Sequence, residues 1–511
     1  MSRQYITTAI DYPNAAPHMG HVLEKVLADV MARWFRLRGD EVRFQIGTDE
    51  HGIKIQQTAE KEKLTPRQLV DRNVPIFEEL YAKLGISADV FIRTSDEKKH
   101  WPTVNTLWKK LQSAGVLEKR TYTGFYCAGC ERFLTKKDLV EGMCDIHKVK
   151  PQEVKEENWF FKLSDETAWL KKLLEKDYTI IPKFRENETM ALLESGLEDV
   201  SFSRPRSSLT WGIPVPDDSE QTMYVWCDAL TNYISGLGYF TDHEERKWWD
   251  DATVTHVIGK DIARFHALIW PAMLKHAGVK MPDQLLIHGF LTNEGQKMSK
   301  SLGNVVKPDE VLAHFGGNPD PLRFYLSHEV PVGNDGDFSW KRIDEVYVSK
   351  LGNQLGNMLN RVLVMLKKEN TDLTIPVSTE DVTATQKLWE DFRAKLDAFD
   401  LHGALQLVVT NVDAMNRAFN AAEPWKLKGA EKIASLSRFA ESLRHVSLMV
   451  LPFIPGTAQK MAMQLGLPYA GAMLERTFVL SDEMTSWNGA QGWSRVGEPA
   501  ILFPPLEKKP A

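Results

Sequence analysis

The sequence predicts an α/β protein: a doubly wound, Rossmann-type parallel sheet with an inserted domain and a C-terminal bundle of α-helices. Three observations predict this fold. Strand-like and helix-like segments alternate through the first third of the chain, a cysteine-rich segment interrupts them, and the last third is helical almost throughout. The 511 residues fit about three domains at roughly 150 residues each.

The alternation begins at the amino terminus. Apolar residues recur at helical spacing between Val22 and Phe35, Gly39 stands where that helix would end, and Thr65 with Pro66 begins another helix. The segments around these helices are strand-like, namely 4–9, 42–46 and 90–92. This β-α-β-α-β order is typical of a parallel sheet covered by helices on both faces.

The pattern breaks near Tyr122 and resumes with strands at 253–258 and 284–287, separated by a helix at 262–275. From about Asp344 onward the chain is helical. We therefore expect four segments: the first half of the sheet domain at 1–116, an insertion at 117–220, the second half of the sheet domain with a stem region at 221–345, and a helical domain at 346–511.

Composition excludes several classes of protein. Charged residues make up 26% and apolar residues 43%, which excludes a disordered or collagen-like chain. No apolar run approaches the roughly 18 residues of a membrane span, and the first residues contain no signal-peptide core. We therefore expect a cytoplasmic protein that does not enter a membrane. The net charge of −6 does not by itself indicate a nucleic-acid binder.

The first strand is followed by a phosphate-binding pattern, Pro17-His18-Met19-Gly20-His21, at the start of a long helix. In doubly wound sheets, ligands bind at the carboxyl ends of the strands, and the first helix N-terminus receives phosphate. Gly20 allows a nucleotide to approach the backbone, and His18 and His21 share one helix face. The alternative is a pair of surface histidines, which the short pattern alone does not exclude.

A lysine-rich loop, Lys297-Met298-Ser299-Lys300-Ser301, follows a strand and a polar turn. Two lysines there can neutralise charge on departing phosphates, often the largest catalytic contribution in phosphoryl-type transfers. A solvated lysine loop is the alternative for a generic K-x-x-K. The complete five-residue string, in the other half of the sheet domain from the two histidines, favours the catalytic interpretation.

Three of the four cysteines lie in the insertion as two knuckles, Cys127 with Cys130 and Cys144 with His147. Three thiolates and an imidazole make a closed tetrahedral site typical of structural zinc, with one ion per chain. A redox pair at Cys127 and Cys130 is the alternative, but it leaves the second knuckle unexplained. Cys227 is isolated in sequence, and we interpret it as a packing residue.

The two motifs resemble the signatures of class I aminoacyl-tRNA synthetases, HIGH at His18–His21 and KMSKS at Lys297–Ser301. Within that class the chain is similar to the methionyl-tRNA synthetases over nearly its whole length. Further segments that carry the resemblance are Gly47–Gly52, Tyr224–Ala229, Gly259–Asp261, Phe265–His266 and Lys297–Asn304. The departures are minor: Met19 replaces isoleucine, and Asp11–Ala15 lacks the usual glycine. The resemblance also implies a zinc knuckle in the insertion, with four cysteines in many members.

The resemblance implies an apolar methionine pocket lined by Ala9, Ile10, Tyr12, Asp49, Trp226, Ala229, Tyr233, Phe265 and His266. Asp49 would hold the substrate ammonium. ATP would be bound by His18, Gly20, His21, Asp261, Lys297, Ser299 and Lys300. The catalytic residues would be His18, His21, Lys297 and Lys300, with Mg²⁺ accompanying ATP. From spacing alone, Trp226, Ala229 and Tyr233 at i, i+3 and i+7 are more often a buried helix face.

The helical domain is expected to read the tRNA. Asn353, Asn357 and Arg361 are spaced by four and share a helix face, from which amides and a guanidinium can contact base edges. Trp425, after Pro424, is the candidate platform on which a base stacks. A solvated face and a core tryptophan are the alternative. The resemblance favours the anticodon interpretation, because these positions match the family's anticodon-recognition elements.

The resemblance implies activation of L-methionine by ATP to methionyl-adenylate and pyrophosphate. Methionine then passes to the 2′-hydroxyl of the terminal adenosine of initiator and elongator tRNA(Met), for protein synthesis. Two rivals exist: a silent tRNA-binding paralogue, which would carry a damaged HIGH or KMSKS element, and a nucleotidylyltransferase, which would not need the insertion or the helical tail. Since the family's dimers use a C-terminal extension, and the sequence ends at Ala511 without one, we expect a monomer.

Overall fold

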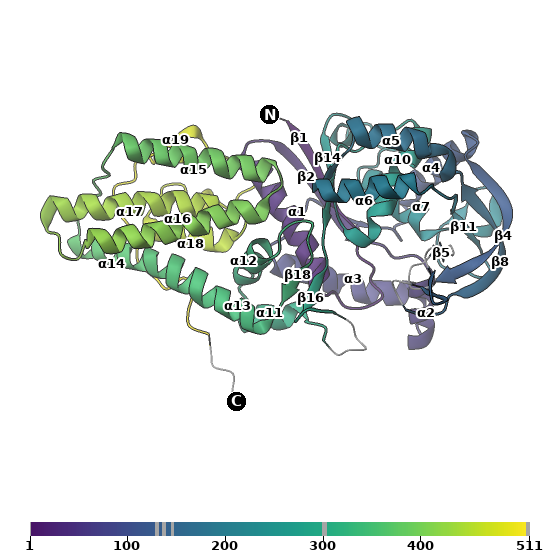
Figure 1. Cartoon of the computed structure of the whole chain (residues 1–511), viewed down its shortest axis with the longest axis horizontal. Coiled ribbons are helices and arrows are strands. Elements are labelled where there is room, and N and C mark those ends of the chain that lie inside the picture. The colour runs from purple at the N-terminus through teal and green to yellow at the C-terminus, as the bar shows by residue number, and fades with distance from the viewer. Residues whose placement is uncertain (1, 128–131, 135–138, 145–147, 299–303, 507–511) are drawn as a thin grey trace.

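The computed structural model describes residues 2–127, 132–134, 139–144, 148–298 and 304–506. Figure 1 shows an elongated molecule in which the parallel sheet and the insertion occupy one end and a bundle of long helices the other. Helix α1 (Met19–Leu37) lies between the two parts. It therefore connects the sheet edge, where α1 begins, to the bundle.

Six parallel strands form the central sheet, in the order β3-β2-β1-β14-β15-β9. They are β1 (Arg3–Thr8), β2 (Glu41–Thr48), β3 (Val90–Arg93), β14 (Thr253–Gly259), β15 (Gln284–His288) and β9 (Thr179–Ile181). Strand β1 pairs with β14, Tyr5 opposite Val254, so the two halves form one sheet. This confirms the predicted doubly wound α/β fold. No sequence pattern indicates β9, because three residues are too few to show a period.

The sheet is covered on both faces. In β1, Ile6 belongs to an apolar cluster that includes α1 and the bundle, whereas its neighbour Tyr5 belongs to a second cluster with Trp108 and Trp270. Successive side chains of a strand point to opposite faces, so these clusters are the two layers around the sheet. The helices of this region are α2 (Ile53–Glu62), α3 (Pro66–Lys83), α4 (Trp101–Ser113), α7 (Val225–Leu230), α8 (Asn232–Ser235), α9 (Lys247–Asp250) and α10 (Trp270–Ala277).

The single helix expected at 262–275 is divided into three segments. A 3₁₀ turn, η3 (Lys260–Ile262), is followed by a π-helical segment, η4 (Phe265–Ile269), and by α10. Pro271 has no amide to donate to Ala267, so regular α-helical bonding cannot run through this point. The interruption places Phe265 and His266 on a π turn, a type of helix that is frequent at functional sites.

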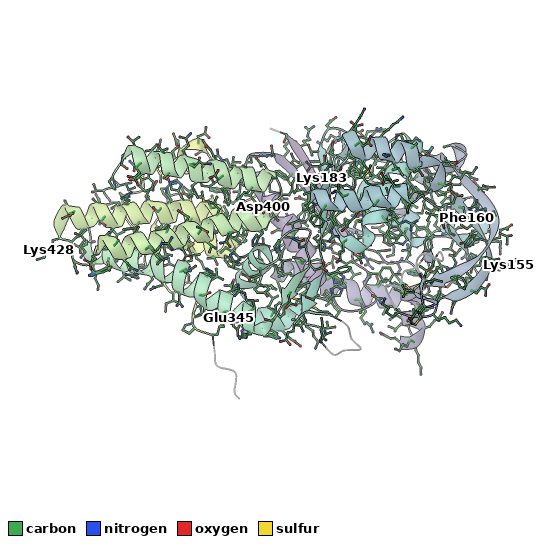
Figure 2. The ribbon with its side chains drawn as sticks, in the orientation of Figure 1. Lys155, Phe160, Lys183, Glu345, Asp400 and Lys428 are labelled. Atoms are coloured by element: carbon green, nitrogen blue, oxygen red, sulfur yellow. The ribbon has the colours of Figure 1, made fainter. Side chains whose placement is uncertain are left out.

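The insertion is mainly antiparallel. Strands β4 (Leu117–Cys127) and β8 (Gln152–Phe161) pair along most of their length, with β5 (Arg132–Leu134) and β10 (Val200–Ser201) at their edges. The smaller elements are β6 (Leu139–Val140), β7 (Met143–Cys144), η2 (Leu163–Glu166), α5 (Thr167–Lys176), α6 (Lys183–Glu194), β11 (Ser203–Pro205), β12 (Pro214–Val215) and β13 (Asp218–Met223). Figure 2 labels Lys155 and Phe160 on this part, at the end of the molecule opposite Lys428.

The helical part follows two connecting helices, α11 (Pro308–His314) and α12 (Asp320–Glu329). It consists of α13 (Trp340–Val346), the π segment η6 (Tyr347–Gly356), α14 (Asn357–Glu369), α15 (Thr379–Asp397), α16 (Leu401–Ala422), α17 (Gly429–Met449) and α18 (Pro455–Leu465). After α18 only the short η7 (Ala470–Ala472) and α19 (Asp482–Thr485) are helical among the described residues. Within the same ranges, no helix has the length and apolar character needed to cross a membrane.

A buried ion pair joins the sheet domain to the bundle. Arg323 of α12 lies 2.7 Å from the Asp29 carboxylate of α1, and both side chains are fully buried. The same guanidinium donates to the carbonyls of Pro452 and Phe453, before α18. Burial opposes the charge of Asp29, yet Arg33 and Arg323 hold its pKa well below the usual range. Helix α1 is therefore fixed relative to the bundle by charged hydrogen bonds as well as by apolar packing.

Candidate active site

Two histidines flank the start of α1, directly after the turn that follows β1. His18 is the N-cap residue: its Nδ1 accepts a hydrogen bond from the Gly20 amide, and His21 Nδ1 accepts one from the His18 amide, each at 3.1 Å. The two rings stack with centroids 3.8 Å apart. A Cβ at position 20 would lie 2.9 Å from His18 Cε1, so a larger residue would displace the ring. The structure thus gathers these three residues at a helix N-terminus, where an anion is favoured.

The surroundings of His21 favour its neutral form. Burial, the stacked His18 ring and the Lys25 ammonium lower the pKa of His21 well below its usual value. Because Nδ1 accepts the His18 amide, the neutral ring carries its proton on Nε2, which lies 4.0 Å from Asp11 Oδ1. His21 therefore presents an N–H donor at the N-terminus of α1.

The lysine-rich motif begins in the second strand of a hairpin. Strand β16 (Leu291–Asn293) pairs with β17 (Gln296–Lys297), and Glu294 and Gly295 make the turn with positive φ. Strand β16 also pairs with β18 (Gly336–Phe338) and packs against α1. Beyond the motif, the Asn304 carbonyl accepts a hydrogen bond from Asn293 Nδ2 at 2.9 Å. The predicted residues Ser299 and Lys300 lie outside the described residues, and only the backbone of Lys297 is described.

Asp261 lies on the same side of the sheet as the histidines, because β14 neighbours β1 and both run in the same direction. A Cβ at Gly259 would lie 2.8 Å from the Asp261 carboxylate and 3.6 Å from the His288 ring. The side chain of Asp261 is exposed to solvent. Asp261 therefore lies at the sheet edge where nucleotides bind in this fold.

The predicted methionine-pocket aromatics form two contacting pairs. Trp226 stacks on Phe265 with centroids 3.5 Å apart, and the Tyr233 hydroxyl lies 2.6 Å from His266 Nε2. Burial lowers the pKa of His266 to about 4, so the ring stays neutral. Trp226 and Ala229 lie on α7, but Tyr233 lies on α8, so the expected single helix is broken at Thr231.

The remaining pocket residues lie at the ends of β1 and β2. The Tyr12 hydroxyl donates to the His51 carbonyl at 2.6 Å, and the Asp49 amide donates to the Asp11 carbonyl at 2.8 Å. Ala9 and Ile10, between β1 and Asp11, are half-buried. The buried Asp228 carboxylate lies 2.6 Å from nitrogens of both His51 and His100, and so joins the segment Gly47–Gly52 to Tyr224–Ala229.

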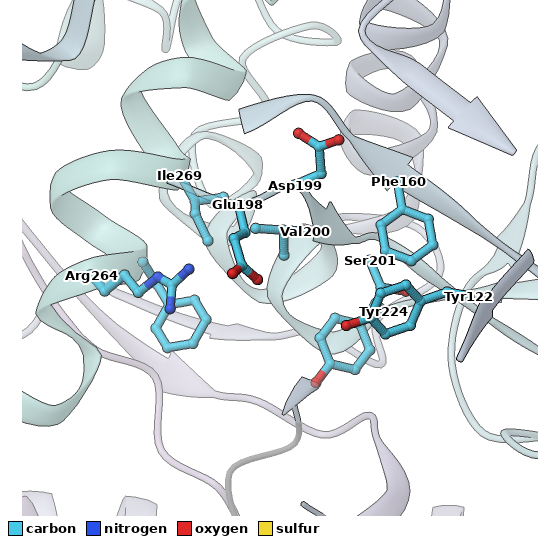
Figure 3. Close-up of a pocket in the computed structure, with 10 residues that line it drawn as sticks. Tyr122, Phe160, Glu198, Asp199, Val200, Ser201, Tyr224, Arg264 and Ile269 are labelled. Carbon is cyan, nitrogen blue, oxygen red and sulfur yellow. The ribbon is translucent and has the colours of Figure 1, made fainter. Parts of the chain in front are cut away.

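A cavity of about 60 Å³, large enough for several water molecules, lies between the insertion and the π turn. Its wall includes Phe265, the residue that stacks on Trp226. Figure 3 shows the Arg264 side chain and the Glu198 carboxylate on one side of this cavity, and Tyr122, Phe160 and Tyr224 on the other. The cavity therefore adjoins the predicted methionine pocket from the side of the insertion.

Sequence reasoning missed a buried cluster of charges beneath His21. Lys25, one helical turn after His21, contacts both Asp11 and Glu24. The available signal was a lysine among the buried residues Val22 and Val26 of an amphipathic helix, in line with His18 and His21 at i, i+3 and i+7. A charged residue in that position requires buried partners, which only the fold reveals.

Two of the four predicted zinc ligands are described. Cys127 and Cys144 are each 1% exposed and share an apolar cluster with Leu134. Cys130 and His147 lie outside the described residues. Among the described residues, no group of three His, Cys, Asp or Glu side chains is arranged to hold a metal ion.

At the bundle, the structure brings two predicted tRNA residues together. The Arg361 guanidinium lies 4.5 Å from the ring centroid of Phe419 and 5.7 Å from that of Trp425. Trp425 is 43% exposed, so part of its side chain is accessible to solvent. Asn353 and Asn357 are exposed, but Asn353 lies on the π segment η6 and not on the α-helix that holds Asn357 and Arg361.

Comparison with known proteins gives consistent matches. The family described as "tRNA synthetases class I (M)" matches residues 4–150 and 135–363. Methionine–tRNA ligase of Brucella suis is 41% identical and covers 92% of this chain and 93% of its own length, and that of Streptomyces coelicolor is 36% identical, covering 99% and 97%. Methionyl-tRNA synthetase of Mycobacterium tuberculosis in complex with methionyl-adenylate superposes with a TM-score of 0.89 at 34% identity, covering 99% of this chain and all of that one.

A parallel doubly wound sheet, with paired histidines at its first helix and a KMSKS hairpin in its second half, defines a class I aminoacyl-tRNA synthetase. The comparisons narrow the class further. The chain belongs to the methionyl-tRNA synthetase family, and it is a ligase that joins methionine to tRNA.

Proposed function

We propose that the chain activates L-methionine with ATP, releasing pyrophosphate, and transfers methionine from methionyl-adenylate to the terminal adenosine of initiator and elongator tRNA(Met). The observation that carries this proposal is the stacked pair His18 and His21 at the N-terminus of α1, on the sheet edge that also holds Asp261. The methionyl-adenylate complex of the M. tuberculosis relative supports it.

In the first step a methionine carboxylate oxygen attacks the α-phosphorus of ATP, and the bond from that phosphorus to the pyrophosphate oxygen breaks. No covalent enzyme intermediate is needed, so the chain contributes position and charge. We assign His18, His21, Lys297 and Lys300 to the charge that develops on the phosphates. We assign Ser299 to the same loop contacts and Asp261 to the ribose hydroxyls. Mg²⁺ accompanies the ATP phosphates and offsets their charge.

Methionine selection requires an apolar pocket, because the side chain offers only a thioether. The stacked rings of Trp226 and Phe265 and the neutral His266 provide such surroundings, and Asp49 would pair with the substrate ammonium. A sulfur atom at an aromatic edge gains about 0.3–1.5 kcal/mol. Methionine-dependent ATP–pyrophosphate exchange, measured with each of the twenty amino acids, tests the proposal. Exchange driven by a different amino acid would overturn the specificity, and no exchange would favour a silent paralogue.

We also propose that the insertion binds one structural zinc ion through Cys127, Cys130, Cys144 and His147. The burial of Cys127 and Cys144 in one small apolar cluster fits this assignment, since two thiols far apart in sequence are brought to the same place. A bound zinc would cross-link the knuckles and stabilise the insertion.

Elemental analysis of the purified chain should find about one zinc per molecule. Cys144→Ser should lose most of that zinc and unfold at a lower temperature, because a hydroxyl is a poor zinc ligand. Cys227→Ser is the matched control: burial raises the pKa of the Cys227 thiol, which disfavours the thiolate, so this variant should retain its zinc. Equal zinc content in both variants would contradict the assignment.

Trp425→Ala should reduce tRNA charging about 10- to 100-fold while leaving methionine-dependent pyrophosphate exchange within about twofold of wild type. The reason is that stacking of one base on an aromatic ring contributes roughly 1–3 kcal/mol. Leu474→Ala, which removes an apolar side chain of equal exposure, is the control and should change neither activity. Equal loss of exchange and charging in Trp425→Ala would refute the proposed division of labour between the two ends of the molecule.

A further inference from the structure

The buried charges beneath the active site have no place in the roles assigned above. Lys25 is fully buried, and its Nζ donates to three oxygens: the Ala9 carbonyl at 2.9 Å, Asp11 Oδ1 at 2.7 Å and Glu24 Oε1 at 2.8 Å. An ammonium has three hydrogens, so every donor is used. We call Asp11, Glu24, Lys25, Tyr81 and His288 the Lys25 cluster.

We propose that Lys25 is a positioning residue for methionine activation. Its ammonium fixes the Asp11 carboxylate beside His21. Through Glu24, it also connects α1 to His288, which ends β15 just before the hairpin of β16 and β17. This inference rests on the role proposed above for His21.

The first arm of the cluster reaches His21. Asp11 is fixed by Lys25 on Oδ1 and by the Tyr81 hydroxyl, which donates to Oδ2 at 2.5 Å. Its backbone is bonded to Gly47 and Asp49 at the end of β2. The Asp11 carboxylate, 4.0 Å from His21 Nε2, therefore has little freedom to move. Movement of Asp11 would alter both the orientation and the protonation of the ring.

A second set of contacts joins Glu24 of α1 to His288 of β15. Glu24 Oε2 lies 3.2 Å from His288 Nε2, and His288 Nδ1 contacts the Gly289 carbonyl at 2.8 Å. His288 is the last residue of β15, and two residues separate it from β16 and the hairpin that carries Lys297. The cluster thus links the two halves of the sheet domain, which carry the two catalytic motifs.

Stability alone does not account for the cluster. Two carboxylates and one ammonium are removed from water here, and replacing buried ion pairs by packed apolar residues is often neutral or stabilising. The charges also set the protonation of their neighbours. Burial raises the pKa of Asp11 to about 6, against the opposing effect of Lys25, and Lys25 also helps to lower the pKa of His21.

The pH dependence follows from the groups that face His21. These are His18 and Lys25 on its own helix, Asp11 from the turn after β1, and, beyond Asp11, Tyr81 from α3, Glu24 and His288. Loss of the Lys25 cation would raise the pKa of Asp11 and of His21 together, since the cation lowers both. Protonation of either group removes the wild-type arrangement. The acidic limb of the pH–activity profile, where activity falls as the pH is lowered, must therefore move to higher pH.

The test is Lys25→Met in the full-length chain, assayed by methionine-dependent pyrophosphate exchange between about pH 5.5 and 9. We expect kcat to fall about tenfold, the methionine KM to stay within about twofold, and the acidic limb to move up by at least half a pH unit. Lys432→Met, which removes a lysine–glutamate pair in the bundle, should leave kcat and the pH profile unchanged. Wild-type kcat with an unmoved acidic limb in Lys25→Met would overturn the inference.

Two further variants guard against a trivial loss of folding. Tyr81→Phe removes only the hydroxyl bonded to Asp11, so it should move the acidic limb upward with little change of kcat at pH 8. The double variant Asp11→Leu/Lys25→Met removes Lys25 together with one of its two carboxylate partners, while Glu24 keeps its contact with His288. It should recover part of the thermal stability lost in Lys25→Met but not kcat. Recovery of kcat would show that Lys25 only balances Asp11, and would refute positioning. Near-normal exchange in His21→Ala would instead overturn the proposed role of His21, whatever Lys25→Met does.

Discussion

Replacing His18 by asparagine should slow methionine-dependent pyrophosphate exchange about 10²- to 10³-fold, the usual cost of losing one donor to developing charge. The substitution separates two roles of His18. Its Nδ1 caps α1 by accepting the Gly20 amide, and asparagine caps helices as well as any residue, so the helix start should survive. The imidazole stacked on His21, which has no equivalent in asparagine, is lost.

The methionine KM of this variant should stay near wild type, because Trp226 and Phe265 are untouched. Circular dichroism and the thermal midpoint should show an intact fold. The exposed His243→Asn serves as the matched control and should exchange normally. Near-normal exchange in His18→Asn would mean that the cap, and not the imidazole, is the function of His18.

The predictable part of the fold consists of long segments with strong periodicity and clear ends. Val22, Val26 and Val30 recur at helical spacing and are buried in α1, and Gly39, with φ of 91°, follows its end as predicted. Thr65 and Pro66 begin α3 with a capping box to Gln68. In these cases the local sequence determines the structure, because the capping and helix-ending interactions are made within a few residues.

The unpredicted features depend on contacts between distant residues. The π segments at Phe265–Ile269 and Tyr347–Gly356 have no repeat in the sequence that distinguishes them from α-helix. Glu24 and His288 meet only because β1 and β15 flank β14 in one sheet. The HIGH and KMSKS strings indicated the class I synthetases, and the further matching segments indicated the methionyl family, because each of these strings is contiguous in the sequence. The buried charges around His21 could not be inferred from the sequence, because their contacts depend on the order of the strands in the sheet.

Lys300→Ala should lower the rate of methionine activation about 10²- to 10³-fold, because the role proposed above for Lys300 is to place a positive charge at the leaving pyrophosphate. The flanks of the motif are fixed independently of position 300: Thr292 pairs with Lys297, and Asn293 bonds to the Asn304 carbonyl. The substitution therefore removes the charge without releasing the hairpin. Methionine affinity should stay near wild type.

Lys300→Arg separates charge from shape. A guanidinium restores the positive charge but replaces a compact ammonium with a planar group, so activity should recover only in part. Lys307→Ala, at an exposed lysine shortly after the motif, controls for general loss of positive charge and should activate methionine normally. If Lys300→Ala forms methionyl-adenylate at a near-normal rate in a single-turnover assay, Lys300 does not stabilise the departing pyrophosphate. The catalytic charge would then have to come from Lys297 and the two histidines.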